Sequence, residues 1–344
     1  MKIGLIGYKG SGKSTLFQWL TQVAPDPSLA HATQSAMSSV PELRVAQLCE
    51  IYKPKKITFA SLEIVDTPGL ARGQHGNAAR LAHLRECDCI ICVVGVFDGA
   101  DPAKEIAAFN EELQLADLEI VSNRITRVEE QKKRPLPKTD QDRVHFEYET
   151  LLMVQSALES GKLLAEGDFT DEQKRVTIAF RLLSEKPRMI LINTPDDEME
   201  LDNYKSFSTP EVPTVAVSVG LEIELEKMEP NQRKEFLDEM GLKSTDRDAV
   251  LRMILDASGQ SLFLTAGEKE VRTWLVRKNA TAVEAAAAIH TDMAKGFIRA
   301  EIFKCEDLVR LGSERAVKAE NLVRREPKDY VLQEGDVVLF HFSG

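Results

Sequence analysis

Cysteine, aromatic residues and long apolar runs are all scarce in this sequence. Five Cys and 6% aromatic residues among 344 residues exclude a small disulfide-rich scaffold. The longest apolar run, residues 89–97, is less than half of the roughly 20 residues that a membrane-spanning helix needs. Basic residues are also in the minority, with 44 Lys and Arg against 55 Asp and Glu, a net charge of −11. This charge excludes a uniformly basic nucleic-acid-binding surface but leaves room for a local basic patch.

The start of the chain resembles no targeting segment. A strand-like stretch at residues 2–7 follows Met1 directly and leaves no room for the charged and apolar regions of a signal peptide. We therefore expect a cytoplasmic protein with no membrane partner, and the sequence contains no DNA-specific motif. The length exceeds one ordinary core and predicts two or three domains.

Three of the five cysteines, Cys87, Cys89 and Cys92, lie within six residues and raise the question of a metal site. No His or second Cys pair is placed to complete a tetrahedral set, and the segment continues into an apolar strand. We therefore expect buried, reduced thiols.

Strand and helix patterns alternate in the first part of the chain, which predicts an α/β fold with a mostly parallel sheet. The predicted strands are residues 2–7, 62–66, 89–96, 188–193 and 214–218.

A helical block interrupts this alternation, and a smaller module follows it. Apolar residues at helical spacing in 113–128 and 148–158 predict an antiparallel helical hairpin with a basic tip at 131–138. From residue 263 the sequence predicts a small α+β module that ends in a pair of strands at 330–332 and 337–342. The predicted domains are residues 1–100 with 185–262, an inserted helical hairpin at 101–184, and a C-terminal domain at 263–344.

Residues 7–14 carry the strongest motif. They read Gly-Tyr-Lys-Gly-Ser-Gly-Lys-Ser and fit the P-loop pattern G-x-x-x-x-G-K-[ST] between a strand and an apolar helix. In such a loop, backbone N–H groups surround phosphate oxygens at a helix N-terminus. Lys13 is expected to reach the β and γ phosphates, and the Ser14 hydroxyl to bind Mg²⁺. The predicted nucleotide-binding residues of the loop are Gly7, Lys9, Gly10, Ser11, Gly12, Lys13, Ser14 and Thr15.

A second motif, Asp66-Thr67-Pro68-Gly69, follows an apolar strand. Asp66 can hold Mg²⁺ through water, while the Gly69 N–H contacts the γ-phosphate, and together with the P-loop this predicts a GTPase-type switch. Thr33 is a further candidate metal ligand. His75 is a candidate to position the attacking water, with a polar loop of no catalytic role as the alternative. The predicted catalytic residues are Lys13, Gly69 and His75.

Residues 193–196, Asn-Thr-Pro-Asp, stand where such proteins read the base with Asn-Lys-x-Asp. Asn193 and Asp196 are therefore candidate base contacts, with Ser218 in a later loop. A carboxylate at this place accepts from guanine but finds no such donors on adenine. Because Thr194 replaces the Lys, guanine selection is weakened. The alternative interpretation of residues 193–196 is a turn with no ligand role.

The chain resembles the YchF or Obg-like ATPase family of translation-factor-class P-loop NTPases, as a divergent member. The match is most specific in Phe-Leu-Thr-Ala-Gly-Glu-Lys-Glu-Val-Arg at 263–272 and in residues 289–301, which are similar to the family's β-grasp-like TGS module. The resemblance implies a GTPase-like domain interrupted by a helical hairpin and followed by TGS. It also implies Mg²⁺-dependent hydrolysis of ATP. This hydrolysis is expected to be slow, because a hydrophobic residue, here Leu70, stands where Ras-like enzymes have a catalytic Gln.

The resemblance further implies partners among ribosomes, RNA or proteins, reached through the hairpin tip or the TGS module. The basic tip residues are candidate phosphate contacts, with a solvated turn as the alternative. Departures from the family are the P-loop centre at residues 8–11, the missing His after Phe97, and Asp196 in place of Glu. The alternatives to a slow ATPase switch are therefore a GTP-specific switch and a nucleotide-binding module without significant turnover. The basic tip residues are Lys132, Lys133, Arg134 and Lys138.

Overall fold

The computed structural model of the chain describes residues 1–344 apart from 30–31, 73–76, 136, 162–163, 165–168 and 344. Contacts between Cα atoms divide the chain into two compact units. The first comprises Met1–Met37 and Glu63–Arg247, and the second comprises Ser38–Leu62 and Asp248–Gly344. No pattern in the sequence indicated that residues 38–62 belong with the C-terminal part. The three-domain division drawn from the sequence stays a prediction.

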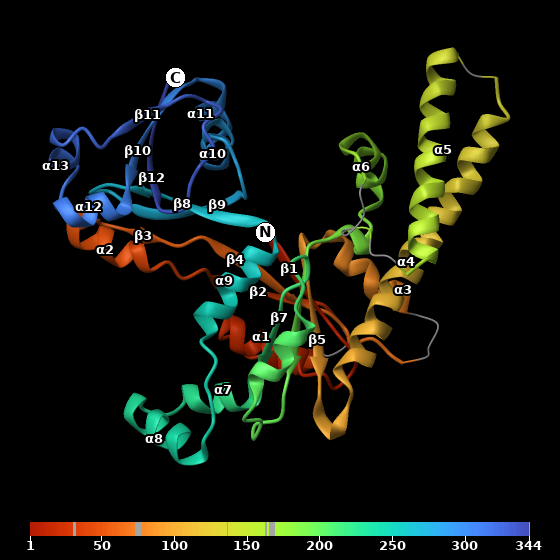
Figure 1. Ribbon diagram of the computed structural model, residues 1–344, viewed down its shortest axis with the longest axis horizontal. Coiled ribbons are helices and arrows are strands. Elements are labelled where there is room, and N and C mark those ends of the chain that lie inside the picture. The colour runs from red at the N-terminus through yellow and green to blue at the C-terminus, as the bar shows by residue number, and fades with distance from the viewer. Residues whose placement is uncertain (30–31, 73–76, 136, 162–163, 165–168, 344) are drawn as a thin grey trace. The chain divides into compact units, whose positions relative to one another are not determined.

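The first unit is built on a six-stranded sheet with the order β2-β4-β1-β5-β6-β7 (Figure 1). The pairs β1–β4, β1–β5, β5–β6 and β6–β7 are all parallel. Every residue of β6 is buried, as expected for a strand that is covered on both faces. The predicted mostly parallel α/β sheet is thus confirmed. The strands are β1 (Lys2–Ile6), β2 (Gln34–Ser39), β4 (Ser61–Asp66), β5 (Cys89–Gly95), β6 (Arg188–Asn193) and β7 (Thr214–Val217).

Helices surround this sheet, and one apolar core lies between the sheet and the first turns of α4. It includes Ile6, Val94, Phe109 and Leu113. The α-helices are α1 (Lys13–Thr21), α3 (Asn77–Ala82), α4 (Pro102–Lys132), α5 (Lys138–Glu159), α6 (Asp171–Thr177), α7 (Val219–Glu226) and α8 (Pro230–Met240). The 3₁₀ turns are η1 (Pro27–Leu29), η2 (His83–Glu86), η3 (Phe97–Gly99), η5 (Ile178–Phe180), η6 (Leu183–Glu185) and η7 (Leu201–Phe207).

The predicted helical hairpin is formed by α4 and α5, which the chain inserts between β5 and β6 (Figure 1). Pro102 begins α4, and the Asp101 side chain caps it by accepting from the Ala103 N–H. With 31 residues, α4 is roughly 45 Å long at 1.5 Å per residue. The two helices share a core that includes Val121, Val128 and Leu151.

The second unit contains a mixed six-stranded sheet with the order β11-β10-β12-β8-β9-β3. The pairs β8–β9, β10–β11 and β10–β12 are antiparallel, whereas β8–β12 and β3–β9 are parallel. The strands are β3 (Ile57–Thr58), β8 (Gln260–Ala266), β9 (Val271–Arg277), β10 (Phe297–Lys304), β11 (Arg324–Glu326) and β12 (Asp336–Phe342). The helices are α2 (Leu43–Tyr52), α9 (Arg247–Ala257), α10 (Ala282–Ile289), α11 (Thr291–Lys295), α12 (Cys305–Leu311) and α13 (Glu314–Ala319).

The predicted pairing of two closing strands is wrong. Residues 330–332 form a single bridge, Thr281 to Val331, and β12 pairs with β10 and β8 instead. The physical reason is the buried Asp336 carboxylate, which accepts from the Tyr330 hydroxyl and the Gln333 N–H and so folds this segment into a turn.

Candidate nucleotide-binding site

The P-loop connects the end of β1 to the start of α1. Gly10 and Gly12 have φ of +88° and +86°, which a side chain would strain. Gly12 stands at the N-cap of α1, so the loop meets the positive end of a helix dipole. Gly7 comes so close to β5 that a Cβ there would lie 2.3 Å from the Val93 carbonyl oxygen.

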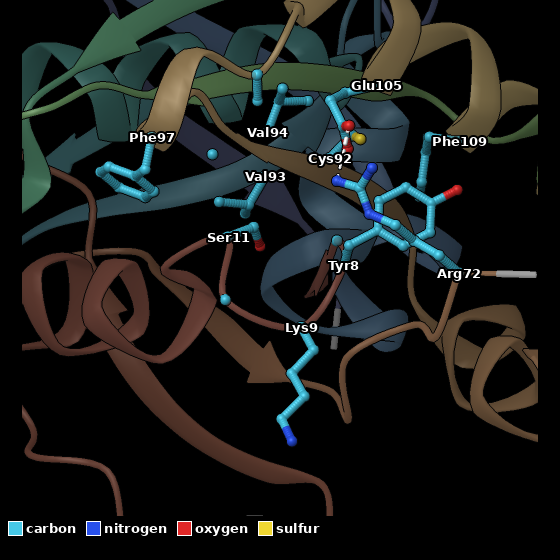
Figure 2. Close-up of a pocket in the computed structure, with 14 residues that line it drawn as sticks. Tyr8, Lys9, Ser11, Arg72, Cys92, Val93, Val94, Phe97, Glu105 and Phe109 are labelled. Atoms are coloured by element: carbon cyan, nitrogen blue, oxygen red, sulfur yellow. Dashed lines mark ion pairs between the residues drawn. The ribbon is translucent and has the colours of Figure 1, made fainter.

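The side chains of the loop point in different directions. Tyr8 lies against the core, and Lys9 extends away from Val93 and Phe97 (Figure 2). The Ser11 hydroxyl is buried and has no hydrogen-bond partner among the described residues. Thr15 is half-buried in the first turn of α1.

Lys13, the first residue of α1, is a buried cation. Its Nζ donates to the Tyr8 carbonyl oxygen at 3.3 Å. Burial lowers the pKa of Lys13, and the nearby Asp66 carboxylate acts in the opposite direction. An ammonium group with one carbonyl partner in a buried place is suited to bind a phosphate oxygen.

The predicted metal ligands Ser14 and Asp66 lie together. Ser14 Oγ donates to Asp66 Oδ2 at 2.7 Å, and Gln34 Nε2 lies 3.4 Å from the same oxygen. Asp66 Oδ1 is buried and has no hydrogen-bond partner in the part of the chain that the structure describes. A hydroxyl and a carboxylate with a free, buried oxygen fit the hard oxygen ligands that Mg²⁺ prefers.

The Thr33 hydroxyl is buried and has no hydrogen-bond partner among the described residues. It lines a small cavity with Lys2, Glu63 and His83, and no hydrogen bond joins it to Ser14 or Asp66 within the described residues. The adjacent Gln34, rather than Thr33, lies beside Asp66. Little in the sequence indicated Gln34, because a single polar residue before a strand belongs to no recognisable motif. The role of Thr33 as a metal ligand stays a prediction.

Gly69 lies against both lysines of the P-loop. A Cβ built on Gly69 would lie 3.0 Å from Lys13 Nζ and 3.2 Å from the Lys9 backbone N. The next residue, Leu70, donates its N–H to the Gly7 carbonyl, and its own carbonyl accepts from the Lys9 N–H. The Leu70 side chain is 1% exposed and belongs to the core. It faces away from solvent and cannot orient a water molecule. His75 lies outside the described residues.

The candidate base loop is tied to the P-loop by Asn193. Asn193 Nδ2 donates to the Ser11 carbonyl at 3.1 Å, and Oδ1 accepts from the Val219 N–H at 3.2 Å. Asp196 is exposed, and its Oδ1 accepts from the Leu221 N–H in the first turn of α7 at 2.9 Å. The loop and the helix start thus hold these two side chains next to the P-loop.

Thr194 and Ser218 form a buried hydroxyl pair. Their oxygens are 2.7 Å apart, and Ser218 Oγ also lies 3.0 Å from the Pro195 carbonyl oxygen. Thr194 is completely buried, so it does not replace the long side chain that a Lys would lay over the base. The Ser218 side chain supports the loop, which leaves its backbone to contact a base.

The three clustered cysteines are free and buried, as expected. Burial raises the pKa of Cys87 to about 11 and that of Cys89 to about 12, and it also raises the pKa of Cys92. These thiols stay protonated and apolar at neutral pH. Among the described residues, no helix combines the length and the apolar character that a membrane crossing requires.

Known proteins match both parts of the chain. A family model described as a 50S ribosome-binding GTPase matches residues 2–124, and the YchF GTPase C-terminal model, described as a protein of unknown function, matches residues 261–343. Ribosome-binding ATPase YchF of Bacillus subtilis (strain 168) is 33% identical over 368 residues, which cover 99% of this chain and 98% of that protein.

Two further relatives extend over the same length. Obg-like ATPase 1 of Oryza sativa subsp. japonica is 34% identical over 371 residues, covering 100% of this chain and 92% of that protein. The solved structure of the Schizosaccharomyces pombe YchF GTPase has a TM-score of 0.83 and 26% identity over 99% of this chain and 97% of that chain.

Proposed function

The chain belongs to the YchF and Obg-like ATPase family of P-loop NTP hydrolases, and on that premise we propose that it is a slow, Mg²⁺-dependent nucleotide switch that prefers ATP over GTP. The observation that carries the proposal is the Ser14–Asp66 hydrogen bond of 2.7 Å, with a buried Asp66 oxygen left for an ion. The bound Mg²⁺ would neutralise charge on the β and γ phosphates.

Each of the other groups would have one task. Lys13 would bind the β and γ phosphates, and the N–H groups at Gly10 and Gly12 would surround them. The Gly69 N–H would contact the γ-phosphate, since Gly69 lies beside Lys13. Because Leu70 is buried and has no polar group, no side chain at that position would orient water, and turnover would be slow.

The base site supports ATP first and GTP as the alternative. Asn193 fixes the loop, whereas Thr194 is buried and covers no base. Asp196 favours guanine by its chemistry, but its Oδ1 already accepts from the Leu221 N–H. This bond uses part of the acceptor capacity of the carboxylate, so the guanine-selecting contact would be weakened.

The partner we propose is a ribosome or its RNA. The Bacillus relative is named a ribosome-binding ATPase, and a cytoplasmic location follows from such a partner. The tip residues Lys132, Lys133, Arg134 and Lys138 are exposed and can neutralise phosphates. Since the whole chain carries −11, contact with RNA would depend on this local cluster or on the second unit.

Calorimetric titration of nucleotide-free protein with ATP and GTP in one Mg²⁺ buffer tests the base preference. We expect tighter binding of ATP, and about 100-fold weaker binding in Lys13→Ala, because a charge-assisted contact contributes about 2–3 kcal/mol. Lys227→Ala, at an exposed lysine of the same unit, should bind as the wild type does. Equal binding by wild type and Lys13→Ala would contradict the proposal.

Phosphate release under multiple turnover separates a switch from a module that only binds nucleotide. The buried Leu70 side chain favours this second candidate. Turnover that stays at the level of Lys13→Ala, even with ribosomes added, would support the binding module. Turnover above that level supports the switch.

A further inference from the structure

Arg72 brings three parts of the first unit together. Its Nη2 forms an ion pair with Glu105 Oε1 of α4 at 2.7 Å, and its guanidinium carbon lies 4.9 Å from the centre of the Tyr8 ring. Figure 2 shows the guanidinium between the Tyr8 ring and the Glu105 carboxylate. The nucleotide-binding roles proposed above use neither Arg72 nor Glu105.

The two partners of the ion pair differ in burial. The Glu105 side chain is 11% exposed, whereas that of Arg72 is 66% exposed. A buried carboxylate is costly without a cation, while an exposed guanidinium is readily hydrated. Tyr8 offers a neutral aromatic ring to the guanidinium, and burial, with further contributions from Glu112 and Glu105, raises its pKa to about 12. The contact therefore joins the first turn of α4 to Arg72.

Arg72 is three residues beyond Gly69, and the backbone between them is short. Leu70 is held by two hydrogen bonds to the P-loop, to the Gly7 carbonyl at 3.0 Å and from the Lys9 N–H at 3.1 Å. A shift of Gly69 toward a γ-phosphate would strain these bonds and displace Arg72, because only two residues intervene. A movement of Gly69 would therefore change the position of Arg72.

Glu105 lies in the first turn of α4, which continues without a break to Lys132 at the hairpin tip. Phe109 and Leu113 anchor the next turns in the core of the sheet, and Val121 and Val128 anchor later turns against α5. The helix, roughly 45 Å long, thus connects the Arg72 contact to the hairpin tip without interruption.

A cavity of about 260 Å³ lies between the ion pair and the P-loop, and its lining includes Arg72 and Glu105 together with P-loop residues 7–11. Close-packed cores resist small displacements, whereas a cavity permits side chains to repack into a second arrangement. The cavity therefore gives the Arg72 and Glu105 side chains space to adopt a second arrangement.

We propose that Arg72 is a positioning residue that couples Gly69 to α4 through Glu105, so that a bound nucleoside triphosphate changes the dynamics of the α4–α5 hairpin. This inference rests on the proposed nucleotide function and gives it a route to the hairpin. The chain would then present a different hairpin to its partner in the triphosphate and diphosphate states.

Hydrogen–deuterium exchange of the full chain with ADP and with a non-hydrolysable ATP analogue tests the coupling. In the wild type, exchange rates in residues 110–132 should differ about threefold or more between the two nucleotides. Arg72→Gln and Glu105→Gln should remove this difference, while calorimetry shows analogue affinities within about threefold of the wild type. Arg72→Lys, which keeps the charge, should retain part of the difference.

Lys104→Gln is the matched control, since Lys104 neighbours Glu105 and is 84% exposed in an ion pair with Asp101. It should keep the wild-type difference. A difference that persists in both Arg72→Gln and Glu105→Gln, or is absent from the wild type, overturns the coupling while nucleotide binding stands. Loss of the exchange difference in Lys104→Gln would also overturn the coupling.

Failure of the wild type to bind nucleotide overturns the proposed function together with this inference. Thermal unfolding identifies any variant that fails to fold, and the exposed position of Arg72 makes Arg72→Gln the variant that decides.

Discussion

Asn193 fastens the base loop to the phosphate loop through Ser11: its Nδ2 donates to the Ser11 carbonyl oxygen at 3.1 Å. Its Oδ1 accepts from the Val219 N–H, so one buried amide holds two loops and the start of α7. The two ends of a nucleotide site are thus fixed relative to each other by one side chain.

Asn193→Ala should weaken nucleotide binding about tenfold or more, because the base loop loses its fixed position. It should also lower the free energy of unfolding by about 1–3 kcal/mol, since buried polar groups lose their partners. Calorimetry and urea unfolding measure the two effects. Asn203→Ala, at an exposed position of η7, serves as the control, and equal behaviour of the two variants would argue against this role.

The two left-handed glycines of the P-loop should respond differently to substitution. A Cβ on Gly12 would lie 2.0 Å from Asn193 Nδ2, whereas a Cβ on Gly10 would meet nothing within 4 Å. Both alanines carry the strain of positive φ, but only Gly12→Ala displaces Asn193. We expect nucleotide affinity to fall much further in Gly12→Ala than in Gly10→Ala. Equal losses by calorimetry would refute the contact.

Removing the free oxygen of Asp66 should remove the response to Mg²⁺. In the wild type, Mg²⁺ should tighten nucleotide binding, since Asp66 Oδ1 is buried and available. Asp66→Asn should bind nucleotide with about the same affinity with and without Mg²⁺. In Ser14→Ala, the effect of Mg²⁺ on affinity should be reduced but not abolished. Titrations with EDTA and with Mg²⁺ measure the ratio, and an unchanged ratio in Asp66→Asn would rule out this ion site.

Asp117 should be important for stability although it lies outside the nucleotide site. Its carboxylate is fully buried, pairs with Arg85 at 2.7 Å and accepts from the N–H groups of Leu183 and Ser184. Asp117→Ala leaves Arg85 without its carboxylate partner and should cost about 3–5 kcal/mol of unfolding free energy. Asp202→Ala, at an exposed ion pair, should change little in the same urea titration. A small effect at Asp117 would contradict the network.

Alkaline pH should destabilise the fold through its buried thiols. Burial raises the pKa of Cys89 to about 12, whereas an unfolded thiol ionises near 8.5. The folded state therefore holds the proton longer, and this stability is present below pH 8.5 and lost as pH rises toward 12. Cys89→Ala should show a shallower decline of the urea midpoint between pH 8 and 10 than the wild type. Parallel declines would exclude this thiol as a cause.

The sequence by itself determined the P-loop motif, the strands β1, β4, β5, β6 and β7 of the first unit, and the α4–α5 hairpin. The glycine spacing at residues 7–14 is typical of a phosphate-binding loop, and the apolar strands and helices have periods that do not depend on distant residues. Ser14 and Asp66 were expected to act on one ion, and the structure places them in contact. Motifs and periodicity were sufficient in each of these cases.

Only the tertiary structure decided which side chains from distant segments meet. It turned Leu70 into the core, buried Thr194 beneath the base loop, and placed Gln34 rather than Thr33 beside Asp66. It also paired Arg72 with Glu105 and joined residues 38–62 to the C-terminal unit. These contacts depend on which face of a strand or loop points inward and on how the elements pack, and one-dimensional spacing does not contain that information.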